Sequence, residues 1–399
     1  MMMMFNVPIK SHNNFINPDF KIEDFMLTNK PLSKSPPSSS SSMMMELDPL
    51  IWSRLPQELL DHILCFLPLK SLLYLRPTCK HFKTLIYTPT FVSKYSSSSP
   101  CSSFLLLSHP QCYNEFPLYD SKLSTWRNLV LPENSVVSNP TPLSASNGLL
   151  CFSMGKSASL LVSNLLTNSS RVIKFPTYSF SFELLTLVST PGAYKVFALC
   201  SKYSSNSVFV YDSKTHIWNR FEGFAPILNE NCHQEGVFSK GCLYFTTPEP
   251  FSVVSFDLET GKWDRPISGL PDELIFVRLV SDHAGGLYLI GGVGRNGISR
   301  RLKLWKLEHD EGNNWIEIES VPELICKKFM SVCYHNYEHV YCFWHEGMIC
   351  VCCYTWPEIL YYKVSRRTWH WLPKCPSLPD KWSCGFKWFS FIPHLYASV

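Results

Sequence analysis

Two short segments contain residues that could bind a phosphate group. Gly292-Val293-Gly294-Arg295-Asn296-Gly297 has the GxGxxG spacing that cradles a pyrophosphate when a strand precedes the glycines and a helix follows them. The next residues, Ile298 to Leu307, predict a strand rich in Arg and Lys, so no helix N-terminus is expected to hold the anion. Gly155-Lys156-Ser157 imitates the end of a phosphate-binding loop, but Leu150 occupies the position of its first glycine. We interpret the first segment as a hairpin loop and reject the second as a phosphate site.

A third segment, Cys350-Val351-Cys352-Cys353, contains a C-x-x-C pair that could bind zinc. Further possible ligands lie nearby in the sequence: Cys342, His335, His339 and His345. A second close pair is missing, and in an alternating strand Cys350 and Cys352 share one face while Cys353 takes the other. We therefore predict buried thiols, with no metal and no cofactor. The thirteen histidines show no spacing that identifies a catalytic triad, because triads are assembled in space.

Composition excludes several other classes of function. The chain has 399 residues, of which 45% are apolar and 14% aromatic, enough for a sizeable core built from many short strands. Lys and Arg number 36 against 32 Asp and Glu, and the resulting net charge of +4 is too small to indicate nucleic acid or an acidic membrane as a partner. No run of about 18 apolar residues predicts a membrane span. Sixteen cysteines without a secretory signal indicate reduced thiols in the cytoplasm or nucleus.

The N-terminal part of the chain has two segments that differ in composition. Residues 1–45 are rich in Asn, Met, Ser and Pro, and we expect them to be disordered because they cannot bury enough apolar surface. Residues 46–95 have helical periodicity: Leu60, Ile63, Leu64 and Leu67 form one apolar stripe, widened by Leu59 and Phe66. Pro68 ends this helix, and two more short helices are expected before Phe91. Three helices of this size have more apolar side chains than their own core can cover, so the excess predicts a partner.

This helical module resembles an F-box. The resemblance is carried by Leu55-Pro56, Leu59, Ile63-Leu64, Leu67-Pro68, Leu72, Leu75-Arg76, Cys79-Lys80, Phe82, Leu85-Ile86 and Phe91. Pro77 and Thr78 depart from the usual pattern at one helix junction. The resemblance implies that the module docks on a Skp-type adaptor. The residues expected in that interface are Leu55, Pro56, Leu59, Ile63, Leu64, Leu67, Pro68, Leu72, Cys79 and Phe82.

Beyond residue 103 a repeat replaces the helical period. In three places an aromatic residue precedes an Asp, and a Trp lies six residues after that Asp: Asp120 and Trp126, Asp212 and Trp218, and Asp257 and Trp263. A fourth copy has Lys in place of Asp, with Tyr362-Lys363 followed by Trp369 at the same interval. Two degenerate copies run from Asn164 to Ser170 and from the strand 302–307 to Trp315. Six units between residues 104 and 396 average about 49 residues, close to the roughly 50 of a kelch repeat. We therefore predict a mainly β chain: a six-bladed kelch-type β-propeller at 104–396, preceded by the small three-helix F-box module.

Each Asp–Trp interval predicts the hairpin between the third and fourth strands of a blade, with the Trp wedged between blades. The first unit is one strand short, since Phe104 to Ser108, Pro117 to Asp120 and Trp126 to Leu131 supply only three strands. A spare strand-like run at residues 386–392 follows the last Trp. We expect it to pair beside Phe104 to Ser108 and close the ring.

The two regions together resemble the plant F-box/kelch-repeat family. That resemblance implies a non-catalytic substrate-recognition subunit of an SCF ubiquitin ligase, joined through the Skp adaptor to a cullin, with the propeller holding a client protein for ubiquitination. Two alternatives remain: a nuclear transcriptional cofactor built from the same modules, and a propeller-based enzyme with copper at its channel. Client binding is expected on propeller loops, and the long connections 221–234 and 372–383 are candidates on length.

Overall fold

The computed structural model describes most of the chain after residue 53. In the N-terminal module the described residues are 54–67, 71–72, 75, 77–85, 88, 90–91 and 94–95. The rest runs from 103 to 399 with gaps at 113–114, 131–139, 155–158, 168, 177–181, 201–206, 225–232, 268, 283, 309–312, 335, 379–380 and 395–396. The predicted disordered segment 1–45 lies outside the described residues.

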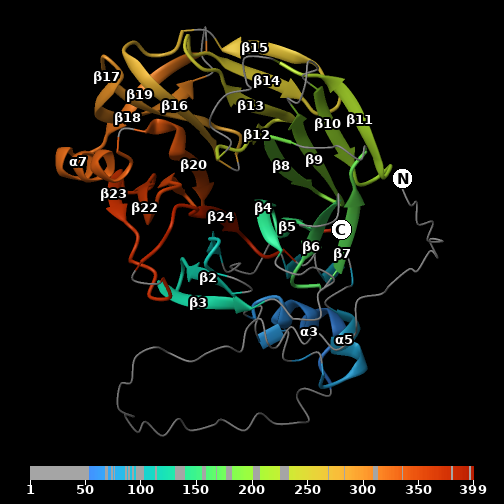
Figure 1. The fold of residues 1–399 in the computed structure, drawn as a ribbon. Coiled ribbons are helices and arrows are strands. Elements are labelled where there is room, and N and C mark those ends of the chain that lie inside the picture. The colour runs from blue at the N-terminus through green and yellow to red at the C-terminus, as the bar shows by residue number, and fades with distance from the viewer. Residues whose placement is uncertain are drawn as a thin grey trace, which may run out of the picture.

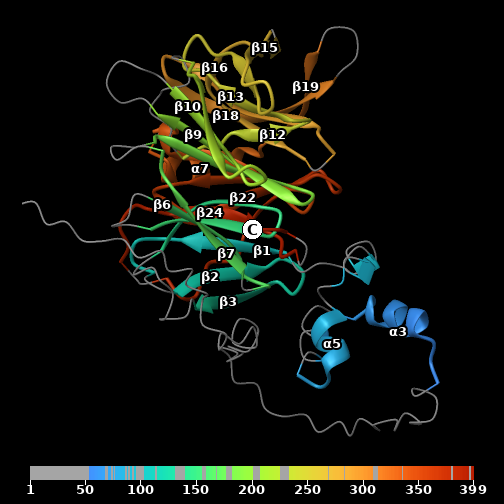
Figure 2. The ribbon, with the colours of Figure 1, turned by 90° about the vertical axis from the view of Figure 1, so that its right-hand side faces the viewer.

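Short helices form the N-terminal module. Helix α3 spans Gln57–Leu64 and α5 spans Lys80–Leu85, and further helical residues lie at 71–72, 75, 90–91 and 94–95. Pro56 precedes α3, where its missing N–H removes no helical hydrogen bond. Figure 2 shows α3 and α5 outside the ring of strands. Among the helices that the structure describes, none has both the length and the apolar character needed to traverse a bilayer.

The described residues from 104 onward form six four-stranded antiparallel sheets, which confirms the predicted propeller (Figure 1). From the axis outward, blade 1 contains β24 (Lys387–Phe391), β1 (Phe104–Ser108), β2 (Glu115–Asp120) and β3 (Thr125–Val130). Blade 2 contains β4 (Thr141–Ser146), β5 (Leu149–Ser153), β6 (Ser159–Asn164) and β7 (Ser169–Lys174), and blade 3 contains β8 (Leu184–Thr190), β9 (Ala193–Cys200), β10 (Ser207–Asp212) and β11 (Ile217–Glu222).

The other three blades repeat this order. Blade 4 contains β12 (Val237–Ser239), β13 (Cys242–Thr246), β14 (Val253–Asp257) and β15 (Trp263–Ile267). Blade 5 contains β16 (Leu274–Ser281), β17 (Leu287–Arg295), β18 (Ile298–Glu308) and β19 (Asn314–Ser320). Helix α7 (Glu323–Val332) and the 3-10 helix η2 (Tyr337–His339) lead to blade 6, which contains β20 (Val340–His345), β21 (Met348–Cys353), β22 (Trp356–Lys363) and β23 (Thr368–Trp371).

Blade 1 joins the two ends of the propeller, as predicted. Strand β24 pairs antiparallel with β1 over five residues, from Phe104 opposite Phe391 to Ser108 opposite Lys387. Leu105, Leu106 and Leu107 on β1 are fully buried. The ring is therefore closed by main-chain hydrogen bonds between segments almost 300 residues apart in the sequence.

The repeated Asp builds the turn between the third and fourth strands. The Asp257 carboxylate accepts hydrogen bonds from the backbone N–H groups of Glu259 and Thr260, both at 2.8 Å, and these bonds hold the pKa of that carboxyl below its usual value. Asp120 and Asp212 accept equivalent bonds. Four residues after each repeat position the backbone φ is positive, at Ser124, His216, Gly261 and Arg367. This reversal fixes the interval that the sequence repeats.

The repeated Trp packs where the interval places it. In four blades the aromatic residue before the turn lies directly opposite the Trp, and the ring centroids are 4.8–5.4 Å apart: Tyr119–Trp126, Tyr211–Trp218, Phe256–Trp263 and Tyr362–Trp369. Trp218 and Trp263 also donate hydrogen bonds of 2.9 Å to backbone oxygens of Lys174 and Glu222 on the preceding blade. The predicted wedge between blades is thus present, and it is structural.

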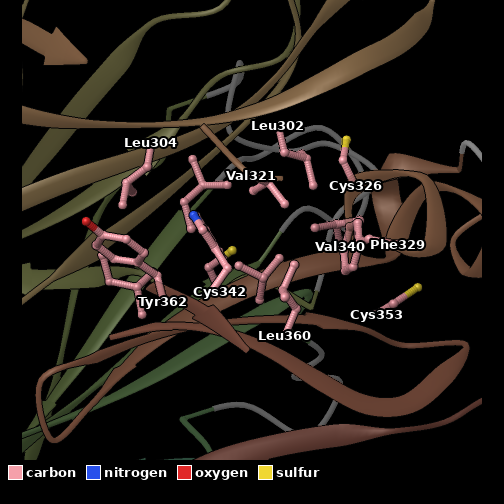
Figure 3. Packing of buried hydrophobic residues seen from close by; sticks show 14 of the residues in the cluster. Leu302, Leu304, Val321, Cys326, Phe329, Val340, Cys342, Cys353, Leu360 and Tyr362 are labelled. Atoms are coloured by element: carbon pink, nitrogen blue, oxygen red, sulfur yellow. The ribbon is translucent and has the colours of Figure 1, made fainter. Parts of the chain in front are cut away.

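The core lies between blades. Figure 3 shows one such region, where Leu302 and Leu304 of blade 5 meet Val340, Leu360 and Tyr362 of blade 6. Residues of the connection through α7, such as Phe329, complete the same cluster. Each blade therefore depends on its neighbours to cover its faces.

The propeller has two different faces. Strands alternate in direction, so the turns that join third to fourth strands, including 121–124 and 258–262, lie on one face together with the start of β1. We call it the hairpin face. The opposite face has the connections from one blade to the next, including 223–236, 321–339 and 372–386, and the turns that join second to third strands. We call it the connection face.

We predict that a chain ending at Cys384 loses the closed ring, because it lacks β24 and leaves the buried β1 as an open edge. Size-exclusion chromatography should show mainly aggregate. A chain lacking only residues 1–45 keeps all six sheets and is the control, expected to be monomeric. A truncated protein that stays monomeric with an unchanged melting temperature would show that the ring closes elsewhere.

Candidate partner-binding surfaces

Helix α3 and the residues that follow it to Leu67 have two apolar stripes on different sides. Leu60, Leu64 and the following Leu67 face the module's core, where they pack with Leu72, Leu85, Phe91 and Tyr95. Leu59 and Phe66 face solvent with 48% and 60% of their side chains exposed. The stripe that the sequence shows as one surface is therefore divided between a core and a solvent face.

The predicted adaptor-binding residues fall into three groups. Pro56, Leu59 and Cys79 are exposed, and Leu55, Ile63, Leu67 and Phe82 are half-buried. Leu64 and Leu72, exposed by 5% and 1%, lie in the core and support the helices rather than offer a surface. Pro68 lies outside the described residues. Phe66 is exposed beside Leu59 but is absent from the predicted set; its spacing of seven residues from Leu59 is the sequence signal that could have included it.

Hydrogen bonds fix the two described helices relative to each other. The Gln57 side chain donates to Asp61 on its own helix at 2.7 Å and lies 2.9 Å from the His81 ring of α5. The Tyr95 hydroxyl donates to the Leu67 backbone oxygen at 3.0 Å. The helix and its flanking residues are therefore held in place, and we call one surface of them the F-box surface: exposed Pro56, Leu59 and Phe66 with half-buried Leu55 and Ile63.

The glycine-rich segment 292–297 forms the hairpin from β17 to β18, as predicted. A side chain at Gly292 would collide with Ser299 and Phe276, and one at Gly294 would collide with the backbone oxygen of Ile298. Gly297 lies in the turn at φ +72°. Close packing and turn geometry account for these glycines.

The cysteines of β21 lie on opposite faces of their strand, as predicted. Cys350 and Cys352 pack in the cluster between blades 1 and 6, whereas Cys353 packs with Cys342 in the cluster between blades 5 and 6. Burial raises the pKa of the Cys342 thiol to about 12. Within the described part of the chain no three His, Cys, Asp or Glu side chains converge as metal ligands, and His335 lies outside it.

His345 is buried and ties blade 6 to blade 1. One ring nitrogen lies 2.6 Å from the Ser121 hydroxyl and the other 2.9 Å from the Ser390 hydroxyl. His339 lies instead on the connection face, near His233. His233 stacks on Tyr354 at 3.9 Å, and burial together with His339 lowers its pKa to about 4. His233 is therefore neutral at physiological pH.

The long connection 221–234 ends at the axis of the propeller. The Gln234 side chain accepts from the Cys342 backbone N–H at 2.8 Å and donates to the Cys342 oxygen at 3.2 Å, as a paired strand would. It also lies 3.5 Å from the Leu279 oxygen of β16. On the inner edge of β20, the backbone N–H and C=O of Cys342 are thereby both bonded by one side chain.

Glu235 and Gly236 complete this arrangement. The Glu235 carboxylate accepts a hydrogen bond from Ser144 on β4 and lies 3.6 Å from the Lys387 ammonium on β24. The Gly236 N–H donates to Thr186 on β8 at 2.9 Å. Residues 234–236 lead into blade 4, and they contact the inner strands of the other five blades. We call them the axial hub. This part of a connection predicted to bind a client has a structural role, whereas residues 225–232 lie outside the described range.

The connection 372–383 also ends against the ring. His109 stacks on Phe386 with centroids 4.3 Å apart, and its Nε2 lies 3.0 Å from the Ser383 oxygen. Because both long connections join an outer strand to the next inner strand, they lie on the connection face.

Comparison with known proteins agrees with this division. A family model described as the F-box domain matches residues 52–94, and one described as the F-box associated beta propeller domain matches residues 105–274. An F-box/kelch-repeat protein of Arabidopsis thaliana is 53% identical over 378 residues, which cover 92% of this chain and 93% of that protein. The chain belongs to the F-box/kelch-repeat family.

More distant relatives align over similar lengths. Protein ABERRANT PANICLE ORGANIZATION 1 of Oryza sativa subsp. japonica is 25% identical over 90% of this chain and 92% of its own length. Protein UNUSUAL FLORAL ORGANS of Arabidopsis thaliana is 24% identical, covering 85% of this chain and 82% of its own. Both alignments cover most of this chain.

We predict that Leu59→Ala together with Phe66→Ala weakens capture of a Skp-type adaptor at least about tenfold, because exposed apolar anchors dominate such interfaces. The measurement is co-precipitation with the purified adaptor. Ile217→Ala on the propeller, where the residue is 58% exposed, is the matched control and should bind fully. Equal recovery of adaptor by the double variant and the control, at equal melting temperature, would contradict the assignment.

We predict that Gln234→Ala lowers the free energy of unfolding by about 2–4 kcal/mol, because it leaves the N–H and C=O of Cys342 without their partner. Denaturant titration of the propeller transition measures this loss. Gln111→Ala removes a glutamine on the same face whose hydrogen bond, accepted from the Ser383 N–H at 3.2 Å, is exposed to solvent, and it should change stability by less than about 0.5 kcal/mol. If both variants are equally stable, the axial hub does not contribute to stability.

Proposed function

We propose that this chain is the substrate-recognition subunit of an SCF-type ubiquitin ligase. The F-box surface would dock on a Skp-type adaptor and through it on a cullin, while the propeller holds a client protein for ubiquitin transfer. The observation that carries the proposal is the second apolar stripe of α3: Leu59 and Phe66 are exposed although the module already has a core. A small module that keeps such a surface apolar is expected to have a partner that covers it.

In this proposal the adaptor and the client bind on different sides of the propeller. Strand β1 begins on the hairpin face, so the F-box module is joined to the propeller from that side. The connection face is the opposite one and has long connections that can vary without opening the sheets. A client bound there would leave the F-box surface available to the adaptor.

In this proposal the chain performs no bond chemistry. The associated conjugating enzyme supplies the thioester and transfers ubiquitin, and this chain contributes proximity by holding a client lysine near it. A closed propeller suits that task because its rigid ring keeps the client at a fixed position relative to the linker.

A reconstituted reaction tests the proposal. We predict that the chain with Skp adaptor, cullin, activating and conjugating enzymes increases ubiquitination of a co-purified client at least tenfold over a reaction without it. Leu55→Ala with Pro56→Ala should abolish the increase, because both residues belong to the F-box surface.

Client capture separates the possible outcomes. The double variant should still retain the client, since its propeller is unchanged. A chain that binds both the adaptor and its client but leaves the client unmodified would overturn the ligase role and favour a cofactor that uses the same modules.

A further inference from the structure

A cavity among the described residues opens on the connection face between blades 4 and 5. Its volume is about 520 Å³, within the range of sites that bind a few side chains or a small ligand. The turn 247–252, the start of β16 and the segment 336–338 surround its mouth. All three belong to the face that the proposed function assigns to the client.

The cavity walls have about as much polar as apolar surface, and much of the apolar part is aromatic. Tyr244, Phe251 and Ile275 are only half-buried, so they keep apolar surface that a ligand can cover. Behind them Phe276 stacks on Tyr337 with ring centroids 4.7 Å apart and planes inclined by 15°. The Tyr337 hydroxyl accepts a hydrogen bond from the Ser299 N–H at 2.8 Å, which fixes this wall.

The axial hub forms the floor. Gln234 and Glu235 line this cavity and also a smaller one of about 190 Å³ on the propeller axis. Because their polar groups are bonded to the inner strands, the floor is held in place before any ligand binds. A ligand therefore meets a formed site and not one that must be assembled.

The charge of the cavity is negative. Its ionisable lining residues are Glu235, Glu249, Glu338 and Arg278. Glu249 and Glu338 are exposed at the mouth. Arg278 is 8% exposed, and its guanidinium donates to the backbone oxygens of Val277, Tyr337 and Val340 at 2.5–2.6 Å.

Neighbouring cations offset part of this charge, because Arg278 interacts electrostatically with Glu338. Lys387 lies beside Glu235 at the floor, and Arg295, near the turn at Gly297, is paired with Glu273 at 2.7 Å. An acidic mouth over an aromatic pocket is complementary to an apolar side chain flanked by Lys or Arg.

We propose that this cavity is the client-recognition pocket and that it binds an exposed client segment in which an aromatic or aliphatic side chain adjoins a basic residue. The apolar side chain would fill the space between Tyr244, Phe251 and Phe276, and the basic residue would face Glu249 and Glu338. The inference rests on the proposed function, because it assigns the pocket to the client.

A peptide selection on the purified full chain tests the pocket directly. The probe is a random nonapeptide library displayed on phage. Enriched peptides should combine an apolar or aromatic residue with an adjacent Lys or Arg, and their binding should weaken as salt is raised. Enrichment of acidic peptides, or no enrichment at all, would overturn the proposal.

Charge reversal locates the binding site. Glu249→Lys with Glu338→Lys should weaken binding of the selected peptides at least about tenfold, and Phe251→Ala should weaken it without changing the preference for basic residues. Glu308→Lys with Glu346→Lys makes the same charge change away from the pocket, where both side chains are exposed, and should bind as the unmodified chain does. Equal loss in all variants, or none in the pocket variants at unchanged melting temperature, would place recognition elsewhere.

The failure of this inference is distinguishable from that of the proposed function. If the charge-reversed pocket variants still capture and ubiquitinate the client, the pocket assignment is wrong and the ligase role stands. If the peptides bind the pocket but the F-box surface captures no adaptor, the ligase role is wrong while the pocket remains a basic-peptide site.

Discussion

The pairing of β24 with β1 is the interaction on which the rest of the structure depends. No blade covers its own faces, so every core cluster of the propeller needs the ring to be complete. Five paired residues at one seam achieve this, and the axial hub secures the inner edges that a closed ring leaves unpaired. The positions of both candidate binding sites depend on this closure. The F-box module is joined to the ring at the start of β1, and the axial hub forms the floor of the pocket.

The propeller could be predicted because its repeat reflects local chemistry. An Asp that accepts backbone N–H bonds, a positive φ four residues later and a Trp opposite an aromatic residue fix one interval in each regular blade. The role of Gln234 could not be read in the same way, because its partner Cys342 is 108 residues away and nothing local distinguishes this glutamine from a surface residue. The same holds for the pocket, whose walls come from six separate segments of the chain.

The F-box surface could be predicted from the sequence only in part. Helical periodicity identifies apolar residues on α3 but does not say which face meets the module's own core, because both stripes recur at the same spacing. Only the packing of Leu60 and Leu64 against Leu72 and Phe91 assigns the inner face, leaving Leu59 and Phe66 outside. Leu64 entered the predicted interface for this reason, whereas Leu72 lies beyond α3 and entered it with the other F-box positions.

The central claim is that one chain binds the adaptor through its F-box surface while the propeller stays available to a client. Hydrogen–deuterium exchange of the full chain, with and without a purified Skp-type adaptor, tests it most directly. The account predicts that the adaptor slows exchange in peptides covering residues 57–66 and leaves the connection face, including residues 247–252 and 336–338, unchanged. Protection on the connection face with none in α3 would contradict it.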